Sequence, residues 1–125
     1  MKISEVSEIS GLSIDTLRYY EKIGLMSPVS RTNGGIREYS ELDVRRLDFI
    51  KCMRTAGLPV DVLIAYFALV EQGDDTIDAR KAILVKQRTR LLARMAEMQE
   101  TLVLLNHKID VYDNAVLKNE QKLTD

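Results

Sequence analysis

One face of a short helix predicted near the N-terminus carries side chains suited to binding an anion. Asp15, Arg18, Tyr19 and Lys22 recur at i, i+3, i+4 and i+7, so they share one side of a helix that Ser13 caps. The opposite side is apolar and narrow, as in a helix that packs on a neighbour by its back. Cations and a phenol on the free side predict contact with a polar groove, such as the major groove of DNA. The alternative is a salt bridge and a packed aromatic ring inside a small helical bundle.

A second pair of cations follows in a segment with the signals of a β-hairpin. The letters NGG at 33–35, between two extended runs, are typical of a tight turn. A two-residue loop would place Arg31 opposite Ile36, whereas a three-residue loop pairs Arg31 with Arg37. Facing cations are unfavourable in an isolated hairpin but favourable when an anion such as a phosphate lies between them. We therefore predict the three-residue loop and a phosphate-binding wing; the alternative is a solvated hairpin without a partner.

Helical periodicity and capping residues place these groups on a small head. Apolar residues at every third position predict a first helix from about Ser4 to Ser10, and Gly11 allows a compact turn into the cationic helix. A third helix is expected to begin after the cap at Ser40, and a fourth at Pro59. The pattern predicts a helix-turn-helix head that carries a hairpin wing.

A long helix with a continuous apolar seam is predicted after the head. The letters GDDT at 73–76 are the linker, so we expect a winged helix-turn-helix domain at 1–72 and a helix with a polar, frayed tail at 73–125. Later apolar residues alternate at spacings of four and three, as in a coiled coil. A helix of about 60 Å leaves this seam uncovered in one chain, so a second copy is expected to cover it, while the first turns pack on the head. The seam consists of Leu91, Met95, Met98, Leu102, Leu105, Ile109, Tyr112 and Val116.

Composition limits the class of protein. Of 125 residues, 46% are hydrophobic and 30% charged, as in ordinary folded domains, and no apolar run is long enough to cross a bilayer. The N-terminus lacks the apolar stretch of a signal peptide, so a cytoplasmic protein is expected. A single cysteine and a single histidine, far apart, predict no disulfide, metal site or cofactor. The sequence has no acid pair in a pocket pattern, no phosphate-binding glycine loop and no nucleophile with a base, so an enzyme is not expected.

The charge balance differs from that of a strongly basic nucleic-acid binder. The formal net charge is -1, and residues 1–70 contain nine Lys or Arg and nine Asp or Glu. Binding to DNA would therefore depend on where the cations lie, and a dimer would double the cationic surface. The competing class is an interaction adaptor whose coiled coil recruits partners while its head does not touch DNA.

The sequence resembles the MerR family of bacterial transcription regulators over essentially its whole length. The resemblance is carried by LSIDTLRYYEKIGL in the second helix, by the wing pattern Arg31-x-x-x-Gly35-x-Arg37-x-Tyr39, by YSELDVRRLDFIKCMRTAGL and by the closing helix. It implies a homodimer with an antiparallel coiled coil and two heads on successive turns of a palindromic operator. It also implies an activator that kinks and untwists the promoter spacer so that RNA polymerase engages both promoter elements.

By position, the resemblance assigns DNA contacts to eight side chains, most of which would fix position on the backbone rather than read bases. The side chains expected to contact the major groove and its phosphates are Arg18, Tyr19 and Tyr20, with Thr16 and Lys22 as weaker candidates. The side chains expected to contact the DNA backbone from the wing are Arg31, Arg37 and Tyr39.

The single cysteine is the candidate sensor. Cys52 lies in FIKCMRTAGL of the third helix, a place similar to that of the lone cysteine in the aldehyde-responsive subgroup of the family. That resemblance implies that an electrophile such as formaldehyde or methylglyoxal modifies the thiolate and shifts the dimer toward its activating form. The alternative is an inert cysteine, packed as a small hydrophobe beside Phe49 and Met53, in an activator or repressor with another inducer. His107 lies outside the seam and is expected to be solvated.

Overall fold

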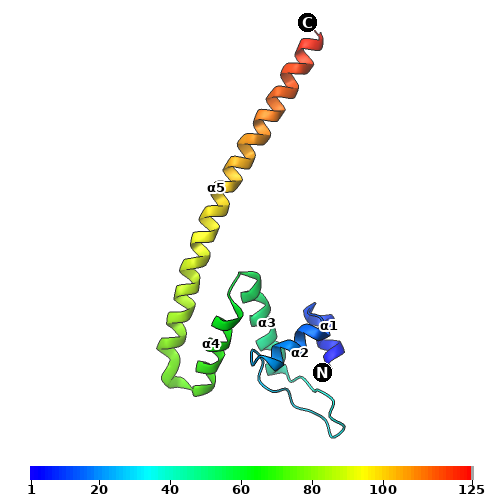
Figure 1. Ribbon diagram of the computed structural model, residues 1–125, viewed down its shortest axis with the longest axis vertical. Coiled ribbons are helices and arrows are strands. Elements are labelled where there is room, and N and C mark those ends of the chain that lie inside the picture. The colour runs from blue at the N-terminus through cyan, green and yellow to red at the C-terminus, as the bar shows by residue number, and fades with distance from the viewer. Residues whose placement is uncertain (125) are drawn as a thin grey trace. The chain divides into compact units, whose positions relative to one another are not determined.

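The chain folds mostly as helices. The computed structural model describes residues 1–124 and gives side chains for residues 1–120. An irregular segment joins the second helix to the third (Figure 1). The elements are α1 (Ile3–Ser10), α2 (Ile14–Lys22), α3 (Glu41–Thr55), α4 (Val60–Gln72), the 3-10 helix η1 (Asp74–Thr76) and α5 (Ile77–Thr124). The prediction of a mostly helical protein is confirmed.

Local chemistry sets where the helices of the head begin and end. Gly11 follows α1 with a φ of 75°, in the left-handed region that glycine adopts at little cost. At the start of α2, Ser13 Oγ accepts the backbone N–H of Thr16 at 3.0 Å. At the start of α3, Ser40 Oγ accepts the N–H of Asp43 at 3.1 Å, and Asp43 Oδ2 accepts the N–H of Ser40 at 2.9 Å. These reciprocal bonds form a capping box, which fixes the direction in which α3 leaves the wing.

The core of the head draws side chains from each of its four helices and from the turn after α2. Burial of Leu17 fixes which side of α2 faces inward, because its neighbours on the other side remain exposed. The hydrophobic effect of this core holds α2 by its apolar back. The fully buried side chains are Val6, Leu17, Leu25, Met26, Leu47, Ile50 and Leu63.

The wing between α2 and α3 contains one antiparallel pair of residues, Arg31 and Arg37. The N–H of Thr32 donates to the carbonyl of Ile36 at 2.8 Å, which places the arginines in a non-hydrogen-bonded pair with their side chains close together. The predicted three-residue register is confirmed, and the alternative pairing of Arg31 with Ile36 is wrong.

The two strands predicted for the wing are not formed, apart from this single pair of residues. Away from it, the backbone finds other partners: the N–H of Val29 donates to Glu21 Oε2, and the N–H of Tyr39 donates to the carbonyl of Met1. Two bonds flank the Arg31–Arg37 pair, from Thr32 to Ile36 and from the N–H of Glu38 to the carbonyl of Ser30 at 2.7 Å, and the pairing ends there. The wing is therefore a loop anchored by side-chain and terminal contacts.

The chain divides into two compact units, Met1–Gln87 and Arg88–Asp125. The first unit reaches beyond residue 72 into the first turns of α5, where Gln87 is only 7% exposed. This agrees with the expectation that those turns pack on the head. The boundary between the units thus falls inside α5 and not at the 73–76 linker.

In the second unit, α5 continues without a break. It reaches Thr124, where a frayed tail after Val116 was expected; the residues from 117 to 124 are mostly good helix formers without glycine or proline. Within one chain the seam is uncovered: Met98 and Tyr112 are each 65% exposed. Among the described residues, no helix is long and apolar enough to cross a membrane.

Candidate nucleic-acid interface

The free face of α2 carries the cations predicted for a recognition helix. Arg18, Tyr19 and Lys22 are exposed, and Tyr19 keeps 52% of its surface accessible. Within the described part of the chain, neither Arg18 nor Lys22 forms an ion pair. The alternative of an internal salt bridge at Arg18 is therefore not supported, and α2 presents two cations that remain available to an anionic partner.

The other two candidates on α2 contact the protein itself. Thr16 is half-buried, and its Oγ1 accepts a hydrogen bond from Ser13 Oγ at 2.8 Å. Tyr20 is half-buried and packs against the core, with its ring centre 6.5 Å from that of Tyr19. Their contacts with DNA stay predictions.

Glu21, near the end of α2, lies between the two wing arginines. Its Oε1 accepts a hydrogen bond from Arg37 Nε at 2.7 Å and lies 3.5 Å from Arg31 Nη2. Its Oε2 accepts the backbone N–H of Val29 at 2.7 Å. The anion that two facing arginines require is thus supplied by the chain itself, and one carboxylate joins the wing to the recognition helix.

The wing arginines keep donors free for a second anion. Arg37 uses Nε for Glu21, and its two Nη groups donate no hydrogen bond within the described residues. Arg31 is 44% exposed at its side chain, and its Nη1 donates to the carbonyl of Gly35 at 3.3 Å. A guanidinium can bind two anions at different edges, so both arginines can hold Glu21 and still bind a phosphate.

The surroundings of Glu21 favour its charged form. Burial acts to raise the pKa of this carboxyl, but the hydrogen bonds from Arg37 and Val29 and the charges of Arg37 and Arg31 outweigh burial. The pKa therefore lies below its ordinary value, and Glu21 is ionised at neutral pH.

Tyr39 lies beneath the wing and not on its surface. Its side chain is 3% exposed, and its hydroxyl is buried without a hydrogen-bond partner among the described residues. Burial raises the pKa of this phenol, and the negative charge of Glu21 raises it further. A phosphate cannot reach the hydroxyl in this position, so the structure differs from the surface role that the family resemblance implied.

Arg46 on α3 was not predicted, yet it joins the turn after α2 to α4. Its Nη2 donates to the carbonyl of Leu25 at 2.8 Å, and its Nη1 donates to Ser27 Oγ at 2.9 Å. The guanidinium also lies 4.0 Å from the ring centre of Phe67, with Glu71 Oε1 at 3.4 Å. The sequence gives no sign that Arg46 makes these contacts while the adjacent Arg45 is exposed.

The candidate sensor lies on the surface. Cys52 is a free, exposed thiol on α3, while Phe49 and Met53 beside it are half-buried. The alternative of a cysteine packed as a small hydrophobe is therefore not supported. His107 is exposed, as expected.

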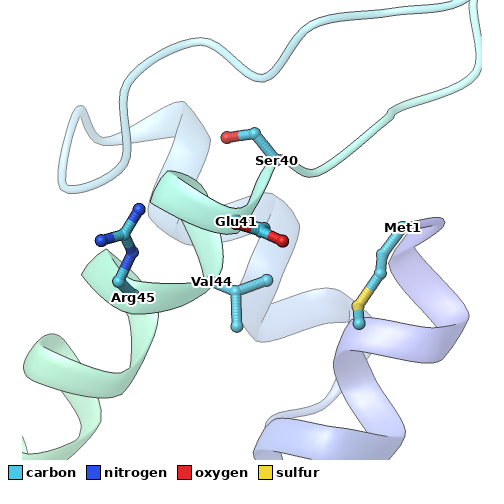
Figure 2. Close-up of a pocket in the computed structure, with 5 residues that line it drawn as sticks. All are labelled: Met1, Ser40, Glu41, Val44 and Arg45. Carbon is cyan, nitrogen blue, oxygen red and sulfur yellow. The ribbon is translucent and has the colours of Figure 1, made fainter.

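A mainly apolar pocket of about 310 Å³ lies at the start of α3. Figure 2 shows Val44 between Met1 and Arg45; Ser40 and Glu41 complete the lining. Cys52 is not among these residues, so the pocket does not form a binding site around the thiol. Among the described residues, no group of three His, Cys, Asp or Glu could hold a metal ion.

A helix-turn-helix head with an exposed cationic helix and an arginine-bearing wing defines a class of DNA-binding proteins. Two family descriptions match the chain: "MerR HTH family regulatory protein" over residues 1–69 and "MerR, DNA binding" over residues 44–108. The chain therefore belongs to the MerR family, and it is a DNA-binding transcriptional regulator.

Individual relatives agree with this assignment. The HTH-type transcriptional regulator AdhR of Bacillus subtilis (strain 168) is 50% identical over 92 residues, which cover 74% of this chain and 66% of AdhR. A putative MerR family transcriptional regulator from Listeria monocytogenes has a TM-score of 0.92 at 44% identity, covering 100% of this chain and 95% of that one. HiNmlR, a MerR family regulator lacking the sensor domain and bound to promoter DNA, has a TM-score of 0.83 at 29% identity, covering 91% and 90%.

Proposed function

We propose that α2 enters the major groove of promoter DNA while Arg31 and Arg37 bind backbone phosphates from the wing. The observation that carries this proposal is the free face of α2, where Arg18 and Lys22 have no ion pair among the described residues. An overall charge of -1 is compatible with this role, because binding depends on where the cations lie, and Arg18, Lys22, Arg31 and Arg37 lie on α2 and the wing.

The proposal includes an activating mechanism. Two heads, joined by α5 helices that pair antiparallel through the seam, would occupy successive turns of a palindromic operator. Binding would kink and untwist the spacer between the two promoter elements so that RNA polymerase engages both. A cytoplasmic location follows, because promoter DNA and polymerase lie there in bacteria.

DNA binding is tested with a duplex that the wild-type protein enriches from a random-sequence pool. Arg18→Ala and Lys22→Ala should each weaken binding and reduce the slope of log K against log salt by about 1, because each loses a phosphate contact. Fluorescence anisotropy over a series of salt concentrations measures both quantities.

The matched control is Lys118→Ala, which removes the same charge from α5. It should leave affinity and slope as in the wild type. If no duplex is enriched, or if the control behaves like the α2 variants, the adaptor class gains support over DNA recognition by α2.

We further propose that Cys52 senses aldehydes or related electrophiles. Support comes from its exposure, which gives a small electrophile access, and from the resemblance to the aldehyde-responsive subgroup together with 50% identity to AdhR. The thiolate sulfur would add to the carbonyl carbon of the aldehyde, and the carbonyl oxygen would take up a proton, so that no oxidant or leaving group is needed. The modified dimer would favour its activating form.

The sensor is tested by transcription in vitro from the promoter upstream of the gene, with wild type and Cys52→Ser across a panel of aldehydes. Cys52→Ser should lose induction and keep promoter affinity, because serine preserves the exposed side-chain shape but not the nucleophile. An equal response of both proteins would make Cys52 inert and point to another inducer or to simple repression.

A further inference from the structure

The position of Glu21 presents an electrostatic contradiction. A carboxylate beside the surface that meets DNA repels phosphate, so charge alone predicts that the protein would bind DNA better without it. Yet this carboxylate is largely buried, with 12% of its side chain exposed, and it bonds to Arg37 and to the backbone of Val29. The Glu21 carboxylate repels DNA phosphate, but it also holds the arginine side chains that would bind phosphate. Its role is therefore to position those arginines.

We propose that Glu21 is the positioning residue of the wing, holding Arg37 and Arg31 where they meet the phosphates flanking the groove that α2 occupies. Its carboxylate spans two elements: it belongs to α2, and all its partners lie in the wing. The inference rests on the proposed wing contact with DNA. The partner concerned is the phosphate backbone of duplex DNA.

The bonding pattern requires a carboxylate and not an amide. Oε1 accepts from Arg37 Nε, and Oε2 accepts from the N–H of Val29, so both oxygens serve as acceptors for donors. Glutamine offers one acceptor and one NH2 group, which would face a donor in either orientation. Glu21→Gln would therefore keep the size of the side chain and release one of its two attachments.

The other edge of Arg37 stays open. Only its Nε is used for Glu21, so the two Nη groups remain for a phosphate. Lysine carries a single point charge and cannot hold a carboxylate on one edge and a phosphate on the other with fixed geometry. Arg37→Lys thus tests the positioning role without altering Glu21.

The experiment measures binding of the purified full chain to the same enriched duplex, over a series of salt concentrations. Glu21→Gln should weaken binding on the order of tenfold, although it removes a negative charge. The salt slope should fall by about 1, because a phosphate contact is lost. Arg37→Lys should weaken binding to a similar extent. In the double variant Glu21→Gln/Arg37→Ala, the losses should not add, because both act through one contact.

The matched control is Glu38→Gln, which removes a 51% exposed carboxylate next to Arg37 in the wing, where its Oε1 pairs with the exposed N-terminal amine at 3.2 Å and not with Arg37. It should bind as the wild type does, or slightly more tightly. A purely structural role of Glu21 would lower the amount of active protein and leave the salt slope unchanged, which would overturn the proposal. Glu21→Gln binding as tightly as Glu38→Gln would also overturn it.

The result separates this inference from the proposed function. If Arg37→Ala weakens binding while Glu21→Gln and Arg37→Lys do not, the wing contacts DNA and Glu21 does not position it. If Arg37→Ala has no effect, the wing contact itself fails and the role of Glu21 fails with it.

Discussion

The carboxylate of Glu21 makes the stability of the head depend on pH. Because its pKa is lower in the folded chain than its ordinary value of 4.5, folding favours the ionised form. The stabilisation is fully present above pH 4.5, where the unfolded chain is also ionised. It is lost as the pH falls through the lower pKa of the folded state, because both states then carry the proton.

We therefore predict that the difference in free energy of unfolding between wild type and Glu21→Gln is largest at neutral pH and shrinks below pH 4.5. Urea unfolding of both proteins across this range measures it. The other carboxylates titrate in both proteins, so their contributions cancel in the difference. A difference that grows on acidification would contradict the assignment of a lowered pKa to Glu21.

At the scale of single residues, the sequence predicted the pairing of the wing arginines but not the source of the anion between them. The register of Arg31 and Arg37 followed from loop length and from the need for an anion. The contacts of Glu21 with Arg31 and Arg37 could not be predicted, because they depend on the path of the irregular segment after α2. Residue spacing does not determine that path. Tyr39 was misplaced for a related reason: a motif position does not reveal which way a ring points.

At the scale of elements, Arg46 holds three parts of the head together. Its guanidinium bonds to the turn after α2 and lies over Phe67 of α4. Arg46→Met removes these bonds and leaves the carbonyl of Leu25 without its donor. We predict a loss of about 2–4 kcal/mol in the free energy of unfolding, from the hydrogen bonds and the cation–π contact.

Urea unfolding at one fixed protein concentration measures this loss, because stability of a dimer depends on concentration. Arg45→Met is the control: it removes the adjacent, exposed arginine, and it should change stability by less than about 0.5 kcal/mol. Equal effects of the two variants would show that Arg46 acts through its charge and not through its contacts.

The helices were predictable because their signals are local. Caps at Ser13 and Ser40 and the turn at Gly11 set helix ends within one or two residues of the expected positions. The strands of the wing were not, because a strand depends on pairing between distant residues, and here the pairing is limited to Arg31 and Arg37.

At the scale of the whole molecule, the seam of α5 predicts how two copies associate. Leu105 lies in the seam and is 55% exposed in one chain. We predict that Leu105→Lys weakens dimerisation by about a hundredfold or more, because each dimer loses two buried leucine side chains and gains two charges at the seam. Sedimentation equilibrium over a range of protein concentrations measures the dissociation constant.

The control is Leu104→Lys, one residue away. Leu104 is 69% exposed and falls outside the heptad seam, so this variant gains the same charge on another side of the helix. It should dimerise as the wild type does. If Leu104→Lys disrupts the dimer and Leu105→Lys does not, the seam has been assigned to the wrong side of α5.

The sequence indicated the need for a second chain, because a helix of this length has more apolar surface than its own head can cover. The sequence pattern does not determine whether the two helices pair parallel or antiparallel, because heptad spacing is the same in both arrangements. Antiparallel pairing came from the family resemblance alone, and it stays a prediction. α5 extends to Thr124, beyond the predicted start of fraying after Val116, because most of the polar residues there are good helix formers.

The carboxylate between the wing arginines also affects the entropy of binding. A free arginine side chain loses about 2 kcal/mol of rotamer entropy when it is fixed. In this protein, part of that entropy is lost when the chain folds and not when it binds DNA. A dimer would contain four such side chains, Arg31 and Arg37 of each chain. Complexes with promoter DNA should therefore last longer than the modest charge of the protein suggests, since the contacts that resist dissociation need little further ordering.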